Sequence, residues 1–217
     1  KKAIYDLMPQ SYYPATLFFN KMTAAEEVLE KIHQGKLKIP LVGKSDIGMK
    51  GMSVKKLETL SDVKEYALTS KVDFLLQEFV PYKNEVGIFY YRYPNENSGK
   101  ISGIVSKEFL AVTGDGASTI LELLKKDKRY ILQLPVLKKI YGKDLKRILS
   151  RGEEFILVPY GNHVRGAKFV DASHLIDEQL TNAIDAVCRQ VSGFYFGRMD
   201  VRYNTWEELK EGKKFSI

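Results

Sequence analysis

The stretch from Val42 to Val54, which reads Val-Gly-Lys-Ser-Asp-Ile-Gly-Met-Lys-Gly-Met-Ser-Val, constrains the fold of this chain more than any other. It follows an apolar run, contains Lys44 and then the glycines Gly48 and Gly51, and ends at the β-branched residue Val54. This pattern predicts a strand, a glycine-rich loop and a returning strand. Because glycines let backbone N–H groups approach an anion, and Lys44 and Lys50 add positive charge, the expected ligand is a triphosphate.

The tripeptide Gly43-Lys44-Ser45 also occurs in P-loops, but the spacing is wrong for that motif. A P-loop requires a glycine five residues before Gly43, where this chain has Lys38. A P-loop also runs directly into a helix, whereas the glycines and Val54 predict a hairpin. Taken alone, the stretch is equally compatible with a glycine-rich hairpin that binds nothing.

The chain of 217 residues is long enough for one large domain or for two small lobes that share a cleft. Its apolar fraction of 44% and charged fraction of 28% are ordinary for a globular protein. No apolar run reaches the roughly 20 residues that span a bilayer, and Cys188 is the only cysteine. We therefore expect no membrane partner, a cytoplasmic location and a buried, unreactive Cys188.

Positive charge is in excess, because 34 Lys and Arg stand against 27 Asp and Glu and give a net charge of +7. Much of the excess lies in two runs, 125–129 and 138–151. Beneath the second run, apolar residues recur near helical spacing, at Leu137, Ile140, Leu145, Ile148 and Leu149. We interpret the runs as solvated helix faces rather than a nucleic-acid patch, and expect an anionic ligand and no nucleic-acid partner.

Runs of alternating or continuous apolar residues, bounded by turn residues, predict strands at 13–19, 72–80, 85–92, 100–112, 155–158 and 194–203, and from 214 onward. The turn at 95–99 favours antiparallel pairing over a doubly wound parallel sheet. Thr23 and Glu26 form a capping-box pattern before a helix that reaches about His33. Later helices are expected to begin at Ser61 or Asp62, at Ser118 or Thr119, and at Asp177, the last running to about Ser192.

Charged and apolar residues alternate in Arg198-Met199-Asp200-Val201-Arg202, within the last clear strand. We expect the charged residues on one face, and Met199, Val201 and Phe196 on the apolar face. An Asp between two Arg is compatible with a salt-bridge ladder. It is equally compatible with a ligand for a hard cation beside a guanidinium that stabilises developing negative charge.

A second polar group interrupts the apolar run at 72–80, where Gln77-Glu78-Phe79-Val80 is followed by Glu85. A strand end followed by a connector offers backbone groups to a purine edge, and a carboxylate can hold ribose hydroxyls. A surface acid at a strand end is the alternative interpretation.

Taken in chain order, three motifs resemble those of the ATP-grasp superfamily: Lys44 with its hairpin, 77–80 with Glu85, and 197–202. The chain is similar, over about 14–217, to the nucleotide-binding region of carboxylate–amine ligases. These include cyanophycin synthetase, D-alanine–D-alanine ligases and peptide ligases. The segment 114–120, Gly-Asp-Gly-Ala-Ser-Thr-Ile, resembles the cyanophycin-synthetase-like branch.

The resemblance implies an α+β fold in which two lobes with largely antiparallel sheets hold ATP between them. Lys44 would contact the α- and β-phosphates and contribute to catalysis. The hairpin from Ser45 to Ser53, including Gly48, Lys50 and Gly51, would be a mobile lid that closes over them.

The resemblance further implies that Glu78 and the backbone through Val80 hold the adenine, with Gln77 and Phe79 also among the nucleotide-binding residues. Glu85 would hold the ribose, and Lys107 would supply a further phosphate contact. By the same resemblance, Arg198 would be catalytic and Asp200 would bind Mg²⁺. In the loop at 161–167, the implied substrate or phosphate contacts are Asn162, His163 and Arg165.

The implied reaction transfers the γ-phosphoryl group of ATP to a carboxylate, and an amine attacks the resulting acyl phosphate. The expected partners are a small carboxylate and a small amine, with homo-oligomer formation left open. The superfamily motif continues with a strand carrying Glu and Asn, so we expect the metal site to be completed after Ile217.

The alternatives to a ligase are a non-catalytic ATP-binding regulatory module and, from charge alone, a nucleic-acid-binding protein. The expected division is a connector from an upstream domain at 1–13, a small lobe at 14–80 and a large, truncated lobe at 81–217.

Overall fold

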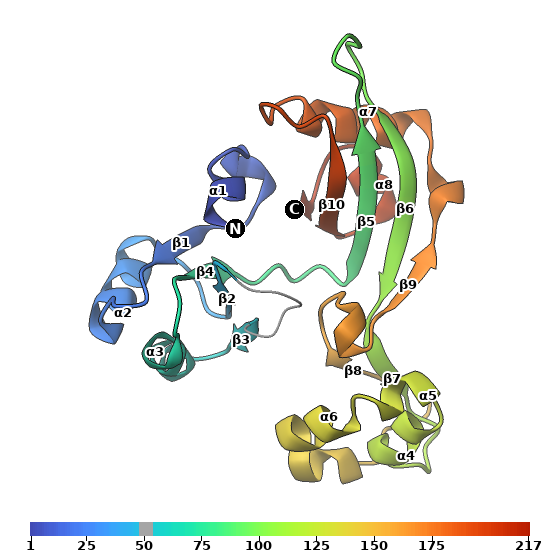
Figure 1. Cartoon of the computed structure of the whole chain (residues 1–217). Coiled ribbons are helices and arrows are strands. Elements are labelled where there is room, and N and C mark those ends of the chain that lie inside the picture. Colours follow the sequence, from blue (N-terminus) through green and yellow to red (C-terminus); the bar gives the residue numbers. More distant parts are fainter. Residues whose placement is uncertain (48–53) are drawn as a thin grey trace. The chain divides into compact units, whose positions relative to one another are not determined.

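The computed structural model describes residues 1–47 and 54–217 (Figure 1). The predicted lid residues Gly48, Lys50 and Gly51 therefore lie outside the described residues. The helices are α1 (Lys2–Tyr5), α2 (Ala25–Gln34), α3 (Leu60–Thr69), α4 (Ile120–Lys125), α5 (Lys128–Ile131), α6 (Leu134–Tyr141), α7 (Glu178–Cys188) and α8 (Trp206–Lys210). Short 3-10 helices are η1 (Gln10–Tyr12), η2 (Gly142–Lys146), η3 (His163–Arg165) and η4 (Ser173–Leu175).

Among the described residues, the strands form three sheets. They are β1 (Thr16–Phe19), β2 (Leu41–Ser45), β3 (Lys55–Leu57), β4 (Phe74–Glu78), β5 (Asn84–Tyr91), β6 (Lys100–Glu108), β7 (Leu110–Thr113), β8 (Glu154–Val158), β9 (Lys168–Asp171), β10 (Phe196–Tyr203) and β11 (Phe215–Ser216). Their orders are β1-β4-β2-β3, β11-β10-β5-β6-β9 and β7-β8. The described residues contain no helix that combines the length and apolar character needed to cross a membrane.

The chain divides into two compact units. Unit 1 comprises Lys1–Asn84, Ile88–Ser102 and Ile176–Ile217, and unit 2 comprises Glu85–Gly87 and Gly103–Leu175. The division passes through β5 and β6, so each unit contains part of the five-stranded sheet.

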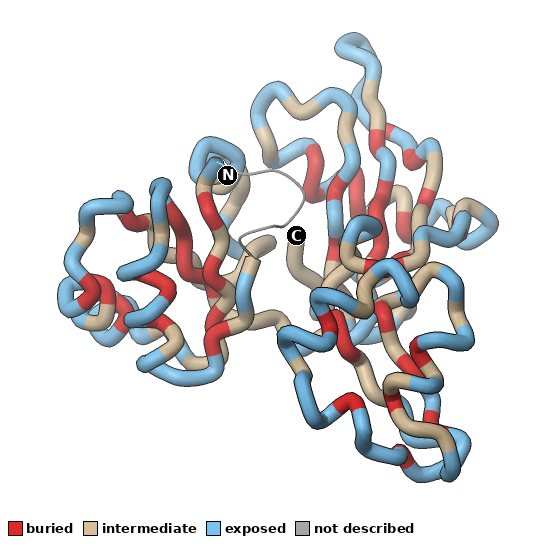
Figure 2. Tube along the Cα trace, turned by 60° about the horizontal axis from the view of Figure 1, so that its bottom comes forward, coloured by how far each residue is buried: buried red, intermediate tan, exposed pale blue. Residues whose placement is uncertain are grey.

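In unit 1, the four-stranded sheet is antiparallel and carries α2 and α3. Gly43 of β2 pairs with Lys55 of β3, so the next described element after β2 is an antiparallel strand and not a helix. The predicted hairpin strands are therefore confirmed. The core beneath the helices, drawn in red in Figure 2, includes Val28, Ile32, Leu41, Leu57, Val63, Phe74 and Leu76.

The capping predictions for α2 and α3 were wrong. Helix α2 has Ala24 as its N-cap with no side-chain cap, because it begins too late for Thr23 to reach its first N–H groups. Glu26 instead pairs with Lys64 at 2.8 Å. Helix α3 is capped by Thr59, whose hydroxyl accepts from the Asp62 N–H at 3.1 Å.

Three other expectations from the sequence are confirmed. Thr119 caps α4 and Asp177 caps α7, although α7 ends at Cys188 rather than near Ser192. Cys188 is buried beside Met199, with the two sulfur atoms 3.6 Å apart. Burial raises the pKa of the Cys188 thiol to about 12, which makes it unreactive at neutral pH.

The prediction for Phe196 was wrong. Met199 and Val201 are buried, as expected, but Phe196 is 81% exposed. Because strand side chains alternate, Phe196 lies on the same face as Arg198.

The termini of unit 1 are held by a contact between distant parts of the chain. The ring of Tyr12 stacks on that of Phe215, with centroids 5.8 Å apart. The Tyr12 carbonyl accepts from the Ile217 N–H at 2.7 Å, and the Tyr12 hydroxyl accepts from the Gln190 amide at 2.7 Å. Tyr12 therefore packs against β11 and against Gln190, two residues after the end of α7.

A buried carboxylate joins α7 to β5. Asp185 accepts from the Tyr90 hydroxyl at 2.7 Å and from the Gly99 N–H at 2.8 Å. A Cβ at Gly99 would lie 2.1 Å from the Tyr90 oxygen, so only glycine fits there. Burial, together with the Asp185 carboxylate, raises the pKa of Tyr90.

We expect Asp185→Ala to lower the free energy of unfolding by about 2–4 kcal/mol, because it leaves two buried donors without an acceptor. Asp185→Asn retains an acceptor oxygen and is expected to cost clearly less. Urea denaturation followed by circular dichroism measures both. Equal losses for the two variants would show that these hydrogen bonds do not hold α7 on β5.

Candidate functional site

Lys44 is held by Gln77 within unit 1. The pairing of β2 with β4 sets Val42 opposite Gln77, and the Lys44 ammonium donates to the Gln77 side-chain oxygen at 2.5 Å. Gln77 is only 4% exposed. The sequence predicted Gln77 as a nucleotide-binding residue, and its side chain here lies against Lys44.

The Gln77 amide has a fixed orientation. Its nitrogen donates to the Thr16 hydroxyl at 2.8 Å and to the Tyr5 hydroxyl at 3.1 Å, so its oxygen is the atom left to face Lys44. Burial raises the pKa of Tyr5, and the hydrogen bond from Gln77 opposes that shift. Tyr5, in the segment predicted as a connector, therefore contributes to the placement of Lys44.

The predicted adenine segment continues from β4 into a connector. Glu78 accepts from the Lys38 N–H at 3.0 Å, and the Phe79 ring lies 4.5 Å from the Lys56 ammonium. Arg202 of β10 donates to the carbonyls of Val80 and Tyr82, both at 3.2 Å. Arg202 thus fixes the backbone that the sequence assigned to a purine edge, a role that sequence reasoning missed.

Arg198 and Asp200 lie together on the exposed face of β10. Their side chains make two contacts, Nε to Oδ1 at 3.0 Å and Nη2 to Oδ2 at 3.3 Å. Both side chains are almost half exposed, at 43% and 48%. The Arg198 guanidinium also lies 5.9 Å from the centre of the Phe89 ring.

Within residues 1–47 and 54–217, no three His, Cys, Asp or Glu side chains gather in a way that would hold a metal ion. Magnesium is commonly bound through one or two carboxylates together with substrate phosphates, rather than by an all-protein cage. An exposed carboxylate such as Asp200 fits the role of one such ligand.

In unit 2, Glu85 and Lys107 form a buried ion pair. The Lys107 ammonium lies 2.7 Å from Oε1 of Glu85, and the two side chains are 2% and 11% exposed. The second carboxylate oxygen accepts from the Gly161 N–H at 3.1 Å. A Cβ at Gly161 would lie 2.2 Å from Cδ of Lys107, so this approach requires glycine.

The loop at 161–167 carries Asn162, His163 and Arg165 and begins at this ion pair. The Asn162 side chain accepts from the Val164 N–H at 2.9 Å, which caps η3. The His163 ring meets the Phe169 ring edge to face, with centroids 5.3 Å apart.

Arg129 of α5 holds the far end of this loop, a role that the sequence did not predict. Its guanidinium donates to the carbonyls of Gly166 at 3.2 Å and Ala167 at 2.7 Å. Nη2 is 2.9 Å from Nδ1 and 3.4 Å from Nε2 of His163, so it lies over the imidazole ring rather than along one lone pair. Gln133 adds a hydrogen bond to the Val164 carbonyl at 2.9 Å.

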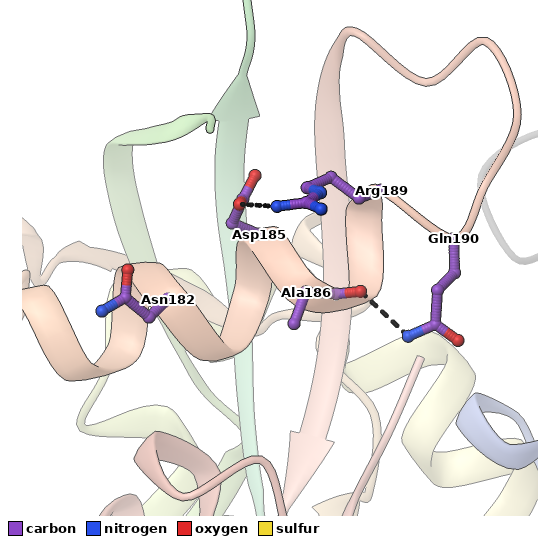
Figure 3. A pocket seen from close by; sticks show the side chains of 5 residues that line it. All are labelled: Asn182, Asp185, Ala186, Arg189 and Gln190. Carbon is purple, nitrogen blue, oxygen red and sulfur yellow. Dashed lines mark hydrogen bonds and ion pairs between the residues drawn. The ribbon is translucent and has the colours of Figure 1, made fainter. Parts of the chain in front are cut away.

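The predicted site residues are distributed over the two units, and the printed contacts join Lys44 to Gln77, Arg198 to Asp200, and Glu85 to Lys107. Unit 1 holds Lys44, 77–80, Arg198 and Asp200, and unit 2 holds Glu85, Lys107 and the loop at 161–167. A surface pocket on α7 of unit 1 contains none of them. It is lined by Asn182, Asp185, Ala186, Arg189 and Gln190 (Figure 3).

No family model matches the sequence, and a search of curated proteins finds no match. The structure is similar to VanG D-Ala:D-Ser ligase from Enterococcus faecalis, with a TM-score of 0.51 and 12% identity over 99% of this chain and 50% of that one. For D-alanine–D-alanine ligase from Bacillus anthracis, the TM-score is 0.47 and the identity 13%, over 94% of this chain and 50% of that one. For the bifunctional glutathione synthetase from Pasteurella multocida, the TM-score is 0.48 and the identity 12%, over 100% of this chain and 30% of that one.

The likeness to the D-Ala:D-Ser ligase identifies the fold. The chain has the ATP-grasp fold, which is α+β with largely antiparallel sheets, and the resemblance inferred from the sequence is confirmed at this level. The chain spans half or less of the length of the three similar structures.

Arg129→Gln is expected to loosen the loop at 161–167, because it removes the donors to two loop carbonyls. Under native conditions, trypsin should then cleave after Arg165 about five times faster in the variant than in the parent protein. This ratio corresponds to about 1 kcal/mol of lost local stability. Mass spectrometry of the cleaved bond measures this rate. Lys128→Gln, at the exposed neighbouring residue, is the matched control, and equal rates for the two variants would contradict the assigned role.

Proposed function

We propose that this chain is the ATP-binding region of an ADP-forming ligase that joins a carboxylate, from an amino acid or peptide, to an amine. The observation that carries the proposal is the ATP-grasp fold with Lys44 on the strand before the glycine-rich segment. Arg198 and Asp200, side by side on the exposed face of β10, support it. The cofactors proposed with it are ATP and Mg²⁺.

In the proposed reaction, a carboxylate oxygen attacks the γ-phosphorus, and the bond from that phosphorus to the β,γ-bridging oxygen breaks to release ADP. The amine nitrogen then attacks the acyl carbon, phosphate leaves with the former carboxylate oxygen, and the nitrogen loses a proton. Such chemistry depends on positioning and charge rather than on a protein nucleophile.

The proposed residue roles follow from placement and charge. Lys44, oriented by Gln77, neutralises phosphate oxygens, and Arg198 stabilises negative charge as the acyl phosphate forms. Bound Mg²⁺ would supply further neutralisation of the phosphates, with Asp200 as a protein ligand. Glu85 and Lys107 serve the ribose and a phosphate, and Asn162, His163 and Arg165 serve substrate or phosphate.

The same proposal includes a nucleotide between two lobes, divided at 14–80 and 81–217 after a connector at 1–13. It also includes the small-molecule substrates, the cytoplasmic location and the lid with Gly48, Lys50 and Gly51.

A non-catalytic ATP-binding module is the second candidate function. The observation that favours it is Asp200, whose carboxylate is engaged by Arg198.

Gln77→Leu is expected to weaken ATP binding about tenfold, because it removes the oxygen that orients Lys44. Adenosine, which has no phosphates, should bind the variant and the parent equally well. Isothermal titration calorimetry with both ligands makes the comparison. An equal loss for ATP and adenosine would instead indicate that Gln77 acts at the base.

ADP release distinguishes the ligase from the module. The full-length protein should bind ATP with Mg²⁺ and release ADP only when a carboxylate is present, tested with amino acids singly and in pairs. Arg198→Ala and Asp200→Ala should each lower this rate at least a hundredfold, about 2.7 kcal/mol or more. Arg189→Ala, at the C-cap of α7, should not.

Failure to bind ATP would reject both candidates. Binding without carboxylate-dependent ADP release would leave the module as the function.

A further inference from the structure

An exposed aromatic side chain borders Arg198 on β10. Phe196 precedes Arg198 by two residues, so the two side chains lie on one face of the strand. Phe196 and Met22 are the most exposed large apolar side chains among the described residues, each at 81%. Met199 and Val201, on the opposite face of β10, are buried. Phe196 is therefore an apolar side chain on the polar face of a strand that is interior to its sheet.

The neighbouring strand β5 runs antiparallel to β10 (Figure 1). The Arg92 N–H, one residue after β5, donates to the Tyr195 carbonyl, one residue before β10, at 2.7 Å. In an antiparallel ladder, such a bond joins two residues that lie opposite each other. Moving one residue back along β5 and one forward along β10 sets Tyr91 opposite Phe196. This pair is of the kind without mutual hydrogen bonds, in which the two side chains are closer.

The same register sets Phe89 opposite Arg198, and a measured contact agrees with it. The guanidinium carbon of Arg198 is 5.9 Å from the centre of the Phe89 ring, which is 39% exposed. Phe89 and Tyr91 are two residues apart on β5, so both rings project from the face that carries Arg198 on β10. Phe89, Tyr91 and Phe196 form what we call the aromatic surface, which belongs wholly to unit 1.

We propose that the aromatic surface binds the side chain of the carboxylate substrate, and that this side chain is large and apolar. The inference rests on the proposed function, in which Arg198 faces the carboxyl group that reacts. Side chains two residues apart on a strand are about 6.7 Å apart. A leucine or phenylalanine side chain covers that distance from its carboxyl group, whereas the methyl group of alanine does not.

The order of side chains along β10 gives the direction in which the substrate extends. Asp200 follows Arg198 and is the proposed protein ligand of Mg²⁺, so the phosphates belong on that side. A carboxylate oxygen attacks the γ-phosphorus in line with the leaving group, so the rest of the substrate points away from the phosphates. On the other side of Arg198 lies Phe196. The substrate's own side chain therefore meets the aromatic surface.

Other substrate classes fit this surface less well. A second carboxylate, as in glutamate, would lose its hydration against the rings. A cationic side chain, as in lysine, would lie beside the guanidinium of Arg198, which carries the same charge. Glycine would leave Phe196 in water. A large apolar side chain gains from removing the rings from water and carries no such cost.

The kinetic test compares carboxylates in the ADP-release assay with the full-length protein. Phenylalanine, leucine and methionine, each as L and D forms, should have a kcat/KM at least tenfold above that of glycine, alanine or glutamate. Phe196→Ala should raise the KM for the large apolar substrates about tenfold and change kcat less than twofold, because the ring contacts the substrate away from the reacting atoms. The KM for ATP should not change.

Binding is measured separately, by isothermal titration calorimetry with Mg²⁺ and the non-hydrolysable nucleotide AMP-PNP present. Phe196→Ala should weaken the better-bound form of phenylalanine about tenfold, and Phe196→Leu, which keeps an apolar side chain, should recover most of that loss. Met22→Ala is the matched control, because Met22 is equally exposed, and it should change neither KM nor Kd. Thermal unfolding checks that each variant folds.

Three results would overturn the inference and leave the proposed function standing. One is ADP release that glycine, alanine or glutamate supports as well as the large apolar amino acids do. Another is a Phe196→Ala variant with unchanged KM and Kd. The third is a Phe196→Ala variant whose molar mass in light scattering differs from that of the parent while its substrate preference does not, which would show that a second copy covers the surface. ATP binding with no ADP release for any carboxylate would reject the ligase and this inference together.

Discussion

The ion pair between Glu85 and Lys107 is the interaction on which unit 2 depends. A buried charge needs a partner and filled hydrogen-bonding positions, because water cannot supply them. Lys107 faces one oxygen of the carboxylate, and the Gly161 N–H faces the other. One side chain thereby joins β5, β6 and the start of the loop at 161–167. If Glu85 holds a ribose, as we propose, the sugar must share a carboxylate already occupied by Lys107.

Sequence reasoning predicted most strands, the hairpin strands around the glycine-rich stretch and the α+β class. These follow from local periodicity and from glycine spacing, which act over a few residues. The capping errors were small shifts: Thr59, not Ser61 or Asp62, begins α3, because several polar residues in a row offer competing caps. The error at Phe196 was different, since strand alternation alone places it beside Arg198.

The residues that position the site were largely invisible in the sequence, because their partners are distant along the chain. Arg202 donates to Val80, and Arg129 donates to Gly166. Nothing near Arg129 distinguishes it from a solvated surface residue, and the motif that contains Arg202 does not indicate its partner. Gln77 was predicted only as a nucleotide-binding residue, and its contact with Lys44 was not, because a motif gives the order of residues but not the direction of a side chain.

The packing of Tyr12 against Phe215 and Ile217 has a consequence during synthesis on the ribosome. A ribosome adds about 5–20 residues per second, so Phe215 and Ile217 are synthesised roughly 10–40 s after Tyr12. The four-stranded sheet needs no residue beyond Glu78 and can form early. Tyr12, in contrast, remains accessible to chaperones and proteases until β11 has emerged.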